Sequence, residues 1–218
     1  MPLSKIRRET GSKVKVMSGG LSGADVKFLE RVHNLGGWEL FDALALHPGR
    51  GHYTPDYLGD KGEYWTYLGT IRKVKAMVSR LGDKPIWITE AYMATLPNNW
   101  WFDSYRLAAE NMVLTYALAM AEGIRNVQLY QLHDSVWYDI GGVDEKDMEY
   151  HHGHLFRDGG IKPSLLAYCT IAEALDRAKF VRWMKFSDAD TKGLLFRTPD
   201  GPVAVSYTHL TLPTTPYV

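Results

Sequence analysis

The segment 84–91 reads KPIWITEA, and its apolar, β-branched run is followed by a carboxylate, Glu90. A buried strand does not end on a charge unless that charge has a partner or a task. Successive side chains of a strand alternate, so Ile86, Ile88 and Glu90 share one face. If that face lines a barrel interior, Glu90 points into the mouth, where a carboxylate can attack or transfer a proton. A carboxylate that caps the next helix or pairs with an arginine would give the same pattern, and the strand alone does not separate these alternatives.

A histidine ends another short apolar run in a similar way. The segment 41–46 reads FDALAL and is followed by His47, which shares a strand face with Ala43 and Ala45. Two small alanines below a histidine leave room beneath a pocket. Other polar side chains also come at the ends of predicted strands, namely Ser18, Gln131, His133 and Asp134.

The elements that carry these residues alternate between strand and helix. Apolar and β-branched runs predict strands over 13–18, 41–46, 85–89 and 127–132, and apolar residues at helical spacing predict helices over 25–35, 64–81, 103–122 and 163–175. After residue 179 the pattern changes to period two, with a turn signal at 198–201 (TPDG).

Strand–helix repeats of this kind predict an α/β fold with a parallel sheet. They fit half of a doubly wound sheet or half of a (βα)8 barrel. No GxGxxG or GxxxxGK[ST] motif follows a strand, which removes support for a nucleotide-binding sheet. The polar residues at the strand ends favour the barrel, where chemistry takes place at the carboxyl ends of the strands. We therefore predict a partial (βα)8 TIM barrel, its C-terminal four βα units, followed by the start of a β-sandwich-like domain.

Composition excludes several classes of partner. The 218 residues include 25 Lys and Arg against 25 Asp and Glu, so no basic surplus draws the chain to nucleic acid. No apolar run reaches the roughly 20 residues that a membrane span requires. The sequence does not indicate a localisation.

Both ends of the sequence look cut. The last segment, 205–218, reads VSYTHLTLPTTPYV and matches the translation of a sequencing-library adapter, so we leave it out of the fold prediction. The predicted organisation is 1–178 as the C-terminal half of a barrel, 179–204 as the start of an accessory β domain and 205–218 as a non-native tail. Unpaired strands at each cut and half a core predict poor stability and no activity for the chain alone.

The order of several segments resembles a known family. KVKVMSGG, FDALALHPG, KPIWITEAY, GIRNVQLYQLHD and GIKPSLLAY follow one another as in the second half of a retaining (βα)8 glycoside hydrolase of the large clan A. The resemblance covers most of residues 5–180 and is strongest to the branches of β-xylosidases, α-L-iduronidases and cellulases. Each segment alone is a weak signal, and the specificity lies in their order and spacing.

This resemblance implies roles for particular residues. Glu90 matches the glutamate that closes the seventh strand and acts as the nucleophile, and His47 matches a residue that shapes the sugar site. The acid/base of the clan is the glutamate of an Asn-Glu pair on the fourth strand. No Asn-Glu dipeptide occurs in this chain, so the resemblance implies that the acid/base lies upstream of Met1. Without it, we expect the chain alone to be inactive.

Sugar sites use flat apolar faces together with polar side chains for the hydroxyl groups. Trp100 and Trp101 follow Glu90, and Trp137 follows the fourth predicted strand, so we expect these three and Gln131 to bind substrate. Packing of the loops onto the barrel rim would explain the tryptophans equally well. Trp38 and Trp65 lie within or beside helices and are predicted to be core residues.

The remaining signals predict no cofactor and no metal. A metal site needs three or four converging ligands, and His151, His152 and His154 are too close in sequence to converge from a loop, so a solvated or sugar-edge loop is favoured. Cys169 falls in an apolar helical segment and is predicted to be a buried thiol. The partner that we expect is an oligosaccharide, polysaccharide or glycoside. Two alternatives stay open, a non-catalytic carbohydrate-binding barrel and a metal-dependent barrel enzyme.

Overall fold

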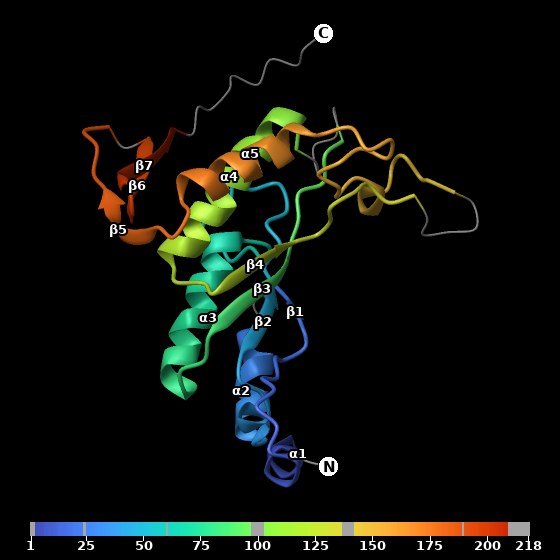
Figure 1. Ribbon diagram of the computed structural model, residues 1–218, viewed down its shortest axis with the longest axis vertical. Helices are drawn as coiled ribbons and strands as arrows, with labels where there is room; N and C mark the ends of the chain where they lie inside the picture. The colour runs from blue at the N-terminus through green and yellow to red at the C-terminus, as the bar shows by residue number, and fades with distance from the viewer. Residues whose placement is uncertain are drawn as a thin grey trace.

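Four parallel strands form the central sheet of the computed structural model, which describes residues 3–23, 25–59, 61–96, 103–136, 142–188 and 190–208. The strands are Leu21–Ser22 (β1), Leu44–His47 (β2), Ile86–Ala91 (β3) and Asn126–Leu129 (β4). They lie side by side in chain order, and every pair is parallel (Figure 1). All four carboxyl ends therefore meet at one edge of the sheet.

A helix follows each strand, which confirms the predicted alternation. The α-helices are Leu3–Thr10 (α1), Val26–Asn34 (α2), Tyr67–Leu81 (α3), Tyr105–Ala121 (α4) and Pro163–Ala174 (α5), and the short 3-10 helices are Gly37–Leu40 (η1) and Met148–Tyr150 (η2). Local capping accounts for two of the helix ends. The side chain of Asp25 accepts a hydrogen bond from the Phe28 amide at the start of α2, and Gly82 ends α3 with a positive φ of 128°.

The first strand differs from its prediction. The segment 13–18 touches the sheet only through its last residues, where Met17 forms a parallel bridge with Ala43 and the Ser18 amide donates to the Ala43 carbonyl. The regular pairing begins after Gly19-Gly20, at Leu21. The β-branched run did not decide where the strand begins. A short edge strand gains little from intrinsic propensity, so its position depends on which residues can pair with β2.

One hydrophobic cluster fills the space between the sheet and helices α2 and α3. Leu44 and Leu46 of β2 and Ile86 of β3 pack there against Val74 and Met77 of α3. These positions of α3 follow the spacing of one helix face, as the sequence predicts.

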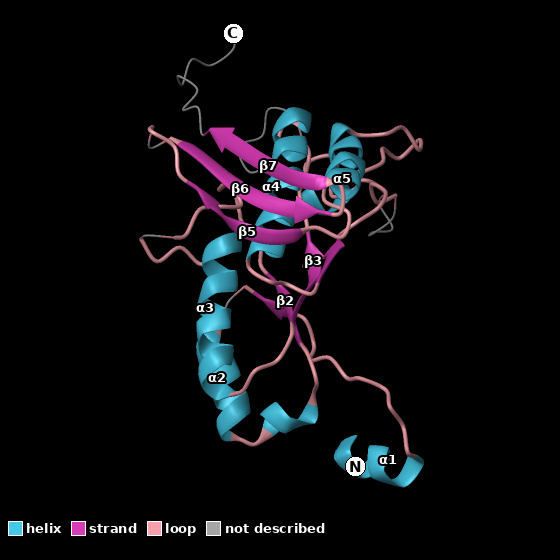
Figure 2. Ribbon diagram, turned by 60° about the vertical axis from the view of Figure 1, so that its left-hand side comes forward, coloured by secondary structure: helices cyan, strands magenta, loops and turns pink. Residues whose placement is uncertain are grey.

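The second sheet is antiparallel and packs against the helices. It consists of Lys179–Met184 (β5), Thr191–Thr198 (β6) and Gly201–Thr208 (β7), so its last strand extends into the segment assigned to the tail. Figure 2 shows this sheet across α4 and α5. Leu194 and Phe196 of β6 are fully buried in a cluster that also contains residues of α3, α4 and α5. The sheet is thus fixed to the helices through a shared hydrophobic core.

Helix α4 is apolar on nearly all sides because it contacts α3, α5 and β5. No helix in the described ranges is both long and apolar enough to cross a membrane.

Apolar side chains are exposed on the first and last helices of the array. Phe28 of α2 is 50% exposed, Leu35 beside it 83%, and Leu166 of α5 59%. Cys169 of α5 is also exposed, so the prediction of a buried thiol was wrong. The apolar composition of α5 indicated burial on all sides, but α5 packs on α4 along one face only.

The burial of Phe196 predicts that docking of the second sheet stabilises the whole chain. We expect Phe196→Ala to lower the free energy of unfolding by about 3–5 kcal/mol, through lost apolar contacts and a cavity. The exposed Phe28→Ala is the control, with an expected change within about 0.5 kcal/mol. Urea titration followed by circular dichroism measures both variants. Equal effects would contradict a shared core.

Candidate functional site

Glu90 reaches the carboxyl edge of the sheet through an irregularity in β3. Ile88 pairs with Val127, but the next pair is Ala91 with Leu129, so β3 has one residue more than β4 between these pairs. Ile88 and Ala91 are both buried against the helices. Such a β-bulge resets the alternation of side chains.

This geometry corrects the reasoning from strand parity. Ile86 and Ile88 face the helices, not the inner face of the sheet. An unbroken strand would have turned Glu90 to the helices with them. Because of the bulge, Thr89 and Glu90 are both available at the other face. The period of the sequence could not show this, since an extra residue in a ladder is defined only by its partner strand.

His47 holds the end of β3 through both of its ring nitrogens. Its Nδ1 lies 3.2 Å from Glu90 Oε2, and its Nε2 lies 3.0 Å from Thr89 Oγ1. The contact of Nε2 with the threonine hydroxyl is a hydrogen bond, and Nδ1 lies within ion-pair distance of the carboxylate. The predicted face of β2 is confirmed, because Leu44 and Leu46 face the helices and His47 does not. A carboxylate held at such an edge beside a histidine is suited to act as a nucleophile or base.

The position of the His47 ring requires Gly20. A Cβ at residue 20 would lie 2.1 Å from His47 Nε2, far inside a van der Waals contact. Gly20 precedes β1, so the neighbouring strand leaves the space that the imidazole fills.

A buried ion pair fastens the loops around this edge. Lys162 and Asp134 are 1% and 3% exposed, and the lysine Nζ donates to Asp134 Oδ1 at 2.7 Å and to Thr95 Oγ1 at 2.7 Å. The same aspartate oxygen accepts from the Gly153 amide at 2.8 Å. Burial lowers the pKa of the Lys162 ammonium, and its hydrogen bond to Asp134 opposes that shift. Lys162 therefore joins the segments after β3, after β4 and before α5. No pattern in the sequence identified Lys162 for this structural role.

The three histidines of the loop before α5 are buried, contrary to the predicted solvated or sugar-edge loop. His151, His152 and His154 are 5%, 2% and 1% exposed. His154 Nδ1 lies 2.9 Å from Ser164 Oγ, and the ring of His152 makes edge contacts with the rings of Tyr92 and Tyr130. Within the described ranges, no group of three His, Cys, Asp or Glu side chains is arranged to hold a metal ion.

Burial also sets the charge state of two of these histidines. The pKa of His152 and the pKa of His154 are each lowered to about 4, mainly because the protonated ring would lose its hydration. Asp134 opposes the shift in both, and Lys162 reinforces it. Both rings are therefore neutral packing elements near pH 7.

The other predicted binding residues have mixed outcomes. Trp100, Trp101 and Trp137 lie outside the described residues. The side-chain amide of Gln131 donates to Ser135 Oγ, within the loop that follows β4. Trp38 is a core residue as predicted, with 2% exposure.

Trp65 is not a core residue, and this prediction was wrong. It is 37% exposed and lies against Gly49, where a Cβ would be 2.6 Å from its Cε3 atom. The hydroxyl oxygen of Tyr92 also lies close to Gly49, 2.3 Å from the position of the same Cβ. Burial and the charges of Glu90 and Glu149 raise the pKa of the Tyr92 phenol, which places Tyr92 near both carboxylates.

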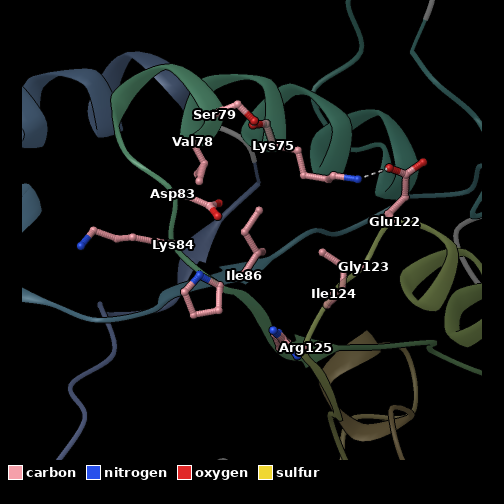
Figure 3. A pocket seen from close by; sticks show the side chains of 11 residues that line it. Lys75, Val78, Ser79, Asp83, Lys84, Ile86, Glu122, Gly123, Ile124 and Arg125 are labelled. Atoms are coloured by element: carbon pink, nitrogen blue, oxygen red, sulfur yellow. Dashed lines mark hydrogen bonds and ion pairs between the residues drawn. The ribbon is translucent and has the colours of Figure 1, made fainter. Parts of the chain in front are cut away.

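A cavity of about 380 Å³ lies at the opposite end of the sheet (Figure 3). It is lined by the start of β3, the segment before β4 and the last turns of α3, and an ion pair of 2.7 Å between Lys75 and Glu122 borders it. Both lysine and acidic side chains line this cavity. In barrel folds the amino-terminal end of the strands serves stability, and chemistry takes place at the other end.

Comparisons with known proteins place the fold. No protein-family model matches the chain, and no curated protein matches it in sequence. Solved structures do match: a family 39 glycoside hydrolase from the gut symbiont Bacteroides cellulosilyticus WH2 (TM-score 0.67, 21% identity, 84% of this chain and 37% of that one) and a family 39 β-xylosidase from Caulobacter crescentus (TM-score 0.50, 17% identity, 88% and 40%). A family 30 endoxylanase from Clostridium papyrosolvens C71 also matches (TM-score 0.54, 14% identity, 94% and 44%).

The chain thus has a glycoside-hydrolase-like fold, with a parallel four-stranded sheet and a separate antiparallel sheet. It spans less than half of the length of each of these structures, 37 to 44%.

The buried ion pair predicts a large loss of stability when one partner is removed. Lys162→Met leaves the Asp134 charge buried without its cation, and we expect the free energy of unfolding to fall by about 3–5 kcal/mol. Adding Asp134→Asn removes that charge and should restore at least half of the loss. Lys73→Met, at an exposed position of α3, is the matched control. Chemical denaturation at pH 7 measures all four proteins, and a double variant as unstable as the single one would contradict this account.

The buried histidines predict a loss of stability in acid. Their folded-state pKa of about 4 lies below the value of about 6.5 in an unfolded chain, so the unfolded state binds more protons between these values. The contribution of these histidines to the free energy of unfolding is therefore fully present above pH 6.5. It is lost as the pH falls toward 4, by about 3 kcal/mol for each histidine.

The measurement is the urea midpoint across this pH range. His154→Gln should flatten the decline, and the same change at the exposed His52 should not. An unchanged slope in His154→Gln would contradict the assignment.

Proposed function

We propose that the chain is the C-terminal half of a (βα)8-barrel glycoside hydrolase that cleaves an O-glycosidic bond with retention, and that Glu90 is its nucleophile. The observation that carries the proposal is the Glu90 carboxylate, brought to the carboxyl edge of the sheet by the bulge and placed 3.2 Å from the imidazole of His47. The fold shared with glycoside hydrolases supports it.

The exposed flanks of the structure agree with a half-barrel. Apolar side chains on α2 and α5, the first and last helices beside the sheet, are open to solvent within the described part of the chain. Further βα units would cover such side chains and pair the free edges of β1 and β4.

The chemistry assigned to Glu90 is a double displacement. Its carboxylate attacks the anomeric carbon, the bond to the leaving oxygen breaks, and an acid protonates that oxygen. Water then attacks the anomeric carbon of the resulting ester, gives its proton to the conjugate base of that acid and releases the Glu90 carboxylate. The imidazole of His47, 3.2 Å from the carboxylate oxygen Oε2, orients the attacking group. The acid/base comes from the upstream half of the barrel, on the Asn-Glu pair that the resemblance implies.

The substrate class in this proposal is a carbohydrate. A β-xylosidase and an endoxylanase are among the proteins of similar fold, so aryl xylosides and xylo-oligosaccharides are the first probes. Aryl glucosides and cello-oligosaccharides provide the comparison.

Substitution of Glu90 tests the nucleophile in the longer protein that carries this chain. We expect Glu90→Gln to lower kcat on an activated aryl glycoside by at least about 10³-fold, equivalent to about 4 kcal/mol of barrier. Glu110→Gln, at an exposed position of α4, should keep wild-type rates. Azide added to Glu90→Ala should restore release of the aryl group and form a glycosyl azide of inverted configuration. Near-wild-type turnover by Glu90→Gln would overturn the assignment.

A further inference from the structure

Two neighbouring aromatic rings at the carboxyl edge are exposed. Tyr64 and Trp65 precede α3 and are 52% and 37% exposed, and their ring centroids lie 4.8 Å apart at an interplanar angle of 89°. Large apolar surfaces left open to solvent at one place on a protein mark a binding site more often than chance.

Both rings lie against glycines that follow strands of the central sheet. The ring of Tyr64 lies over Gly23, directly after β1, where a Cβ would be 2.6 Å from the ring, and its hydroxyl donates to the Ser22 carbonyl at 2.9 Å. Trp65 lies over Gly49, two residues beyond the end of β2. The missing side chains of these glycines make the space in which the two rings rest.

The surface is continuous with the surroundings of Glu90. The Tyr92 hydroxyl contacts the same Gly49 as Trp65, and the backbone of Tyr92 is two residues from Glu90. His47 is two residues before Gly49 and contacts the Glu90 carboxylate. The order across the edge is therefore Tyr64 at β1, Trp65 at β2 and Glu90 at β3.

A second buried ion pair holds the loop that carries Gly49. Arg50 and Asp103 are 6% and 5% exposed and form a hydrogen-bonded ion pair, and Arg50 also donates to the Tyr53 carbonyl at 2.7 Å. The backbone under Trp65 is thus fixed to the segment that begins α4, and the ring is presented from a rigid support.

We propose that Trp65, with Tyr64 beside it, forms a stacking surface for a sugar ring next to the ring that Glu90 attacks. A pyranose presents a face of C–H groups that packs on an aromatic ring, and an exposed indole offers the largest such surface of any side chain. The rings extend from Glu90 toward β1, so the site takes an oligosaccharide of two or more units along that direction. The inference rests on the proposed function, which supplies both the carbohydrate ligand and the position of the ring that is attacked.

Binding to the 218-residue chain tests this assignment without turnover. The chain contains 7 tryptophans, and incorporation of 5-fluorotryptophan gives each a ¹⁹F resonance, of which Trp65→Phe identifies one. Xylotetraose and cellotetraose are the probes. We expect a saturable shift of the Trp65 resonance with one of them, and none of the Trp183 resonance, whose ring lies on β5 beneath Arg72.

Two variants separate stacking from a structural role. Trp65→Ala should weaken the affinity at least 10-fold, whereas Trp65→Phe keeps an aromatic face and should stay within about 3-fold of wild type. The melting temperature of both variants should remain close to that of wild type, because Trp65 is a partly exposed residue.

Each contrary result has a distinct meaning. Saturable binding with equal affinity in Trp65→Ala overturns the stacking surface and leaves Glu90 as the nucleophile untouched. No saturable shift with either oligosaccharide also overturns it, and the azide experiment on Glu90→Ala then decides the proposed function separately. A melting temperature that falls equally in both Trp65 variants assigns the ring to packing.

Discussion

The arrangement at the carboxyl edge depends on one extra residue in β3. Ile88 and Ala91 both face the helices, and two residues stand between them where a regular strand has one or three. Hydrophobic burial fixes both ends of this interval, so Glu90 joins Thr89 on the face that points away from the helices. A single imidazole, His47, can then contact both of them. A charged group is thus positioned by the packing of apolar neighbours.

The loops that surround this edge are held by buried charges. Lys162 joins Asp134 and Thr95, and Arg50 joins Asp103, so that loops after three different strands are tied to fixed elements. Buried ion pairs of this kind add little to net stability compared with apolar residues, but a broken pair is costly. They therefore specify one arrangement of the loops, and a site on loops needs such specification. The neutral histidines beneath them fill space and bring a sensitivity to acid.

The partial coverage of the similar structures and the exposed apolar side chains of this chain both agree with our proposal of a half-barrel. The chain matches 37 to 44% of each of these three similar structures, and its helices α2 and α5 expose apolar side chains. Retaining hydrolysis requires two carboxyl groups about 5–5.5 Å apart. In our proposal this chain supplies one of them, together with the histidine that orients it and an aromatic surface for the neighbouring sugar.

The sequence by itself determined the order of elements and the class of fold. Periods of two and 3.6 residues predicted the parallel strands, the four helices beside them and the change to antiparallel strands near residue 179, because these patterns arise from local geometry and burial. It also selected Glu90 and His47 as residues at strand ends. The start of the first strand was misplaced, since pairing with β2 and not propensity decided it.

Tertiary structure alone decided how these residues meet. Three features depend on contacts between segments far apart in the chain. They are the bulge in β3, the space beside Gly20, and the packing of Tyr64 and Trp65 on Gly23 and Gly49. The burial of the histidines and the exposure of Trp65 and Cys169 follow from which faces have neighbours. Residue type predicts a preference for burial, but the outcome depends on what packs against the residue, and a local pattern carries no information about a distant partner.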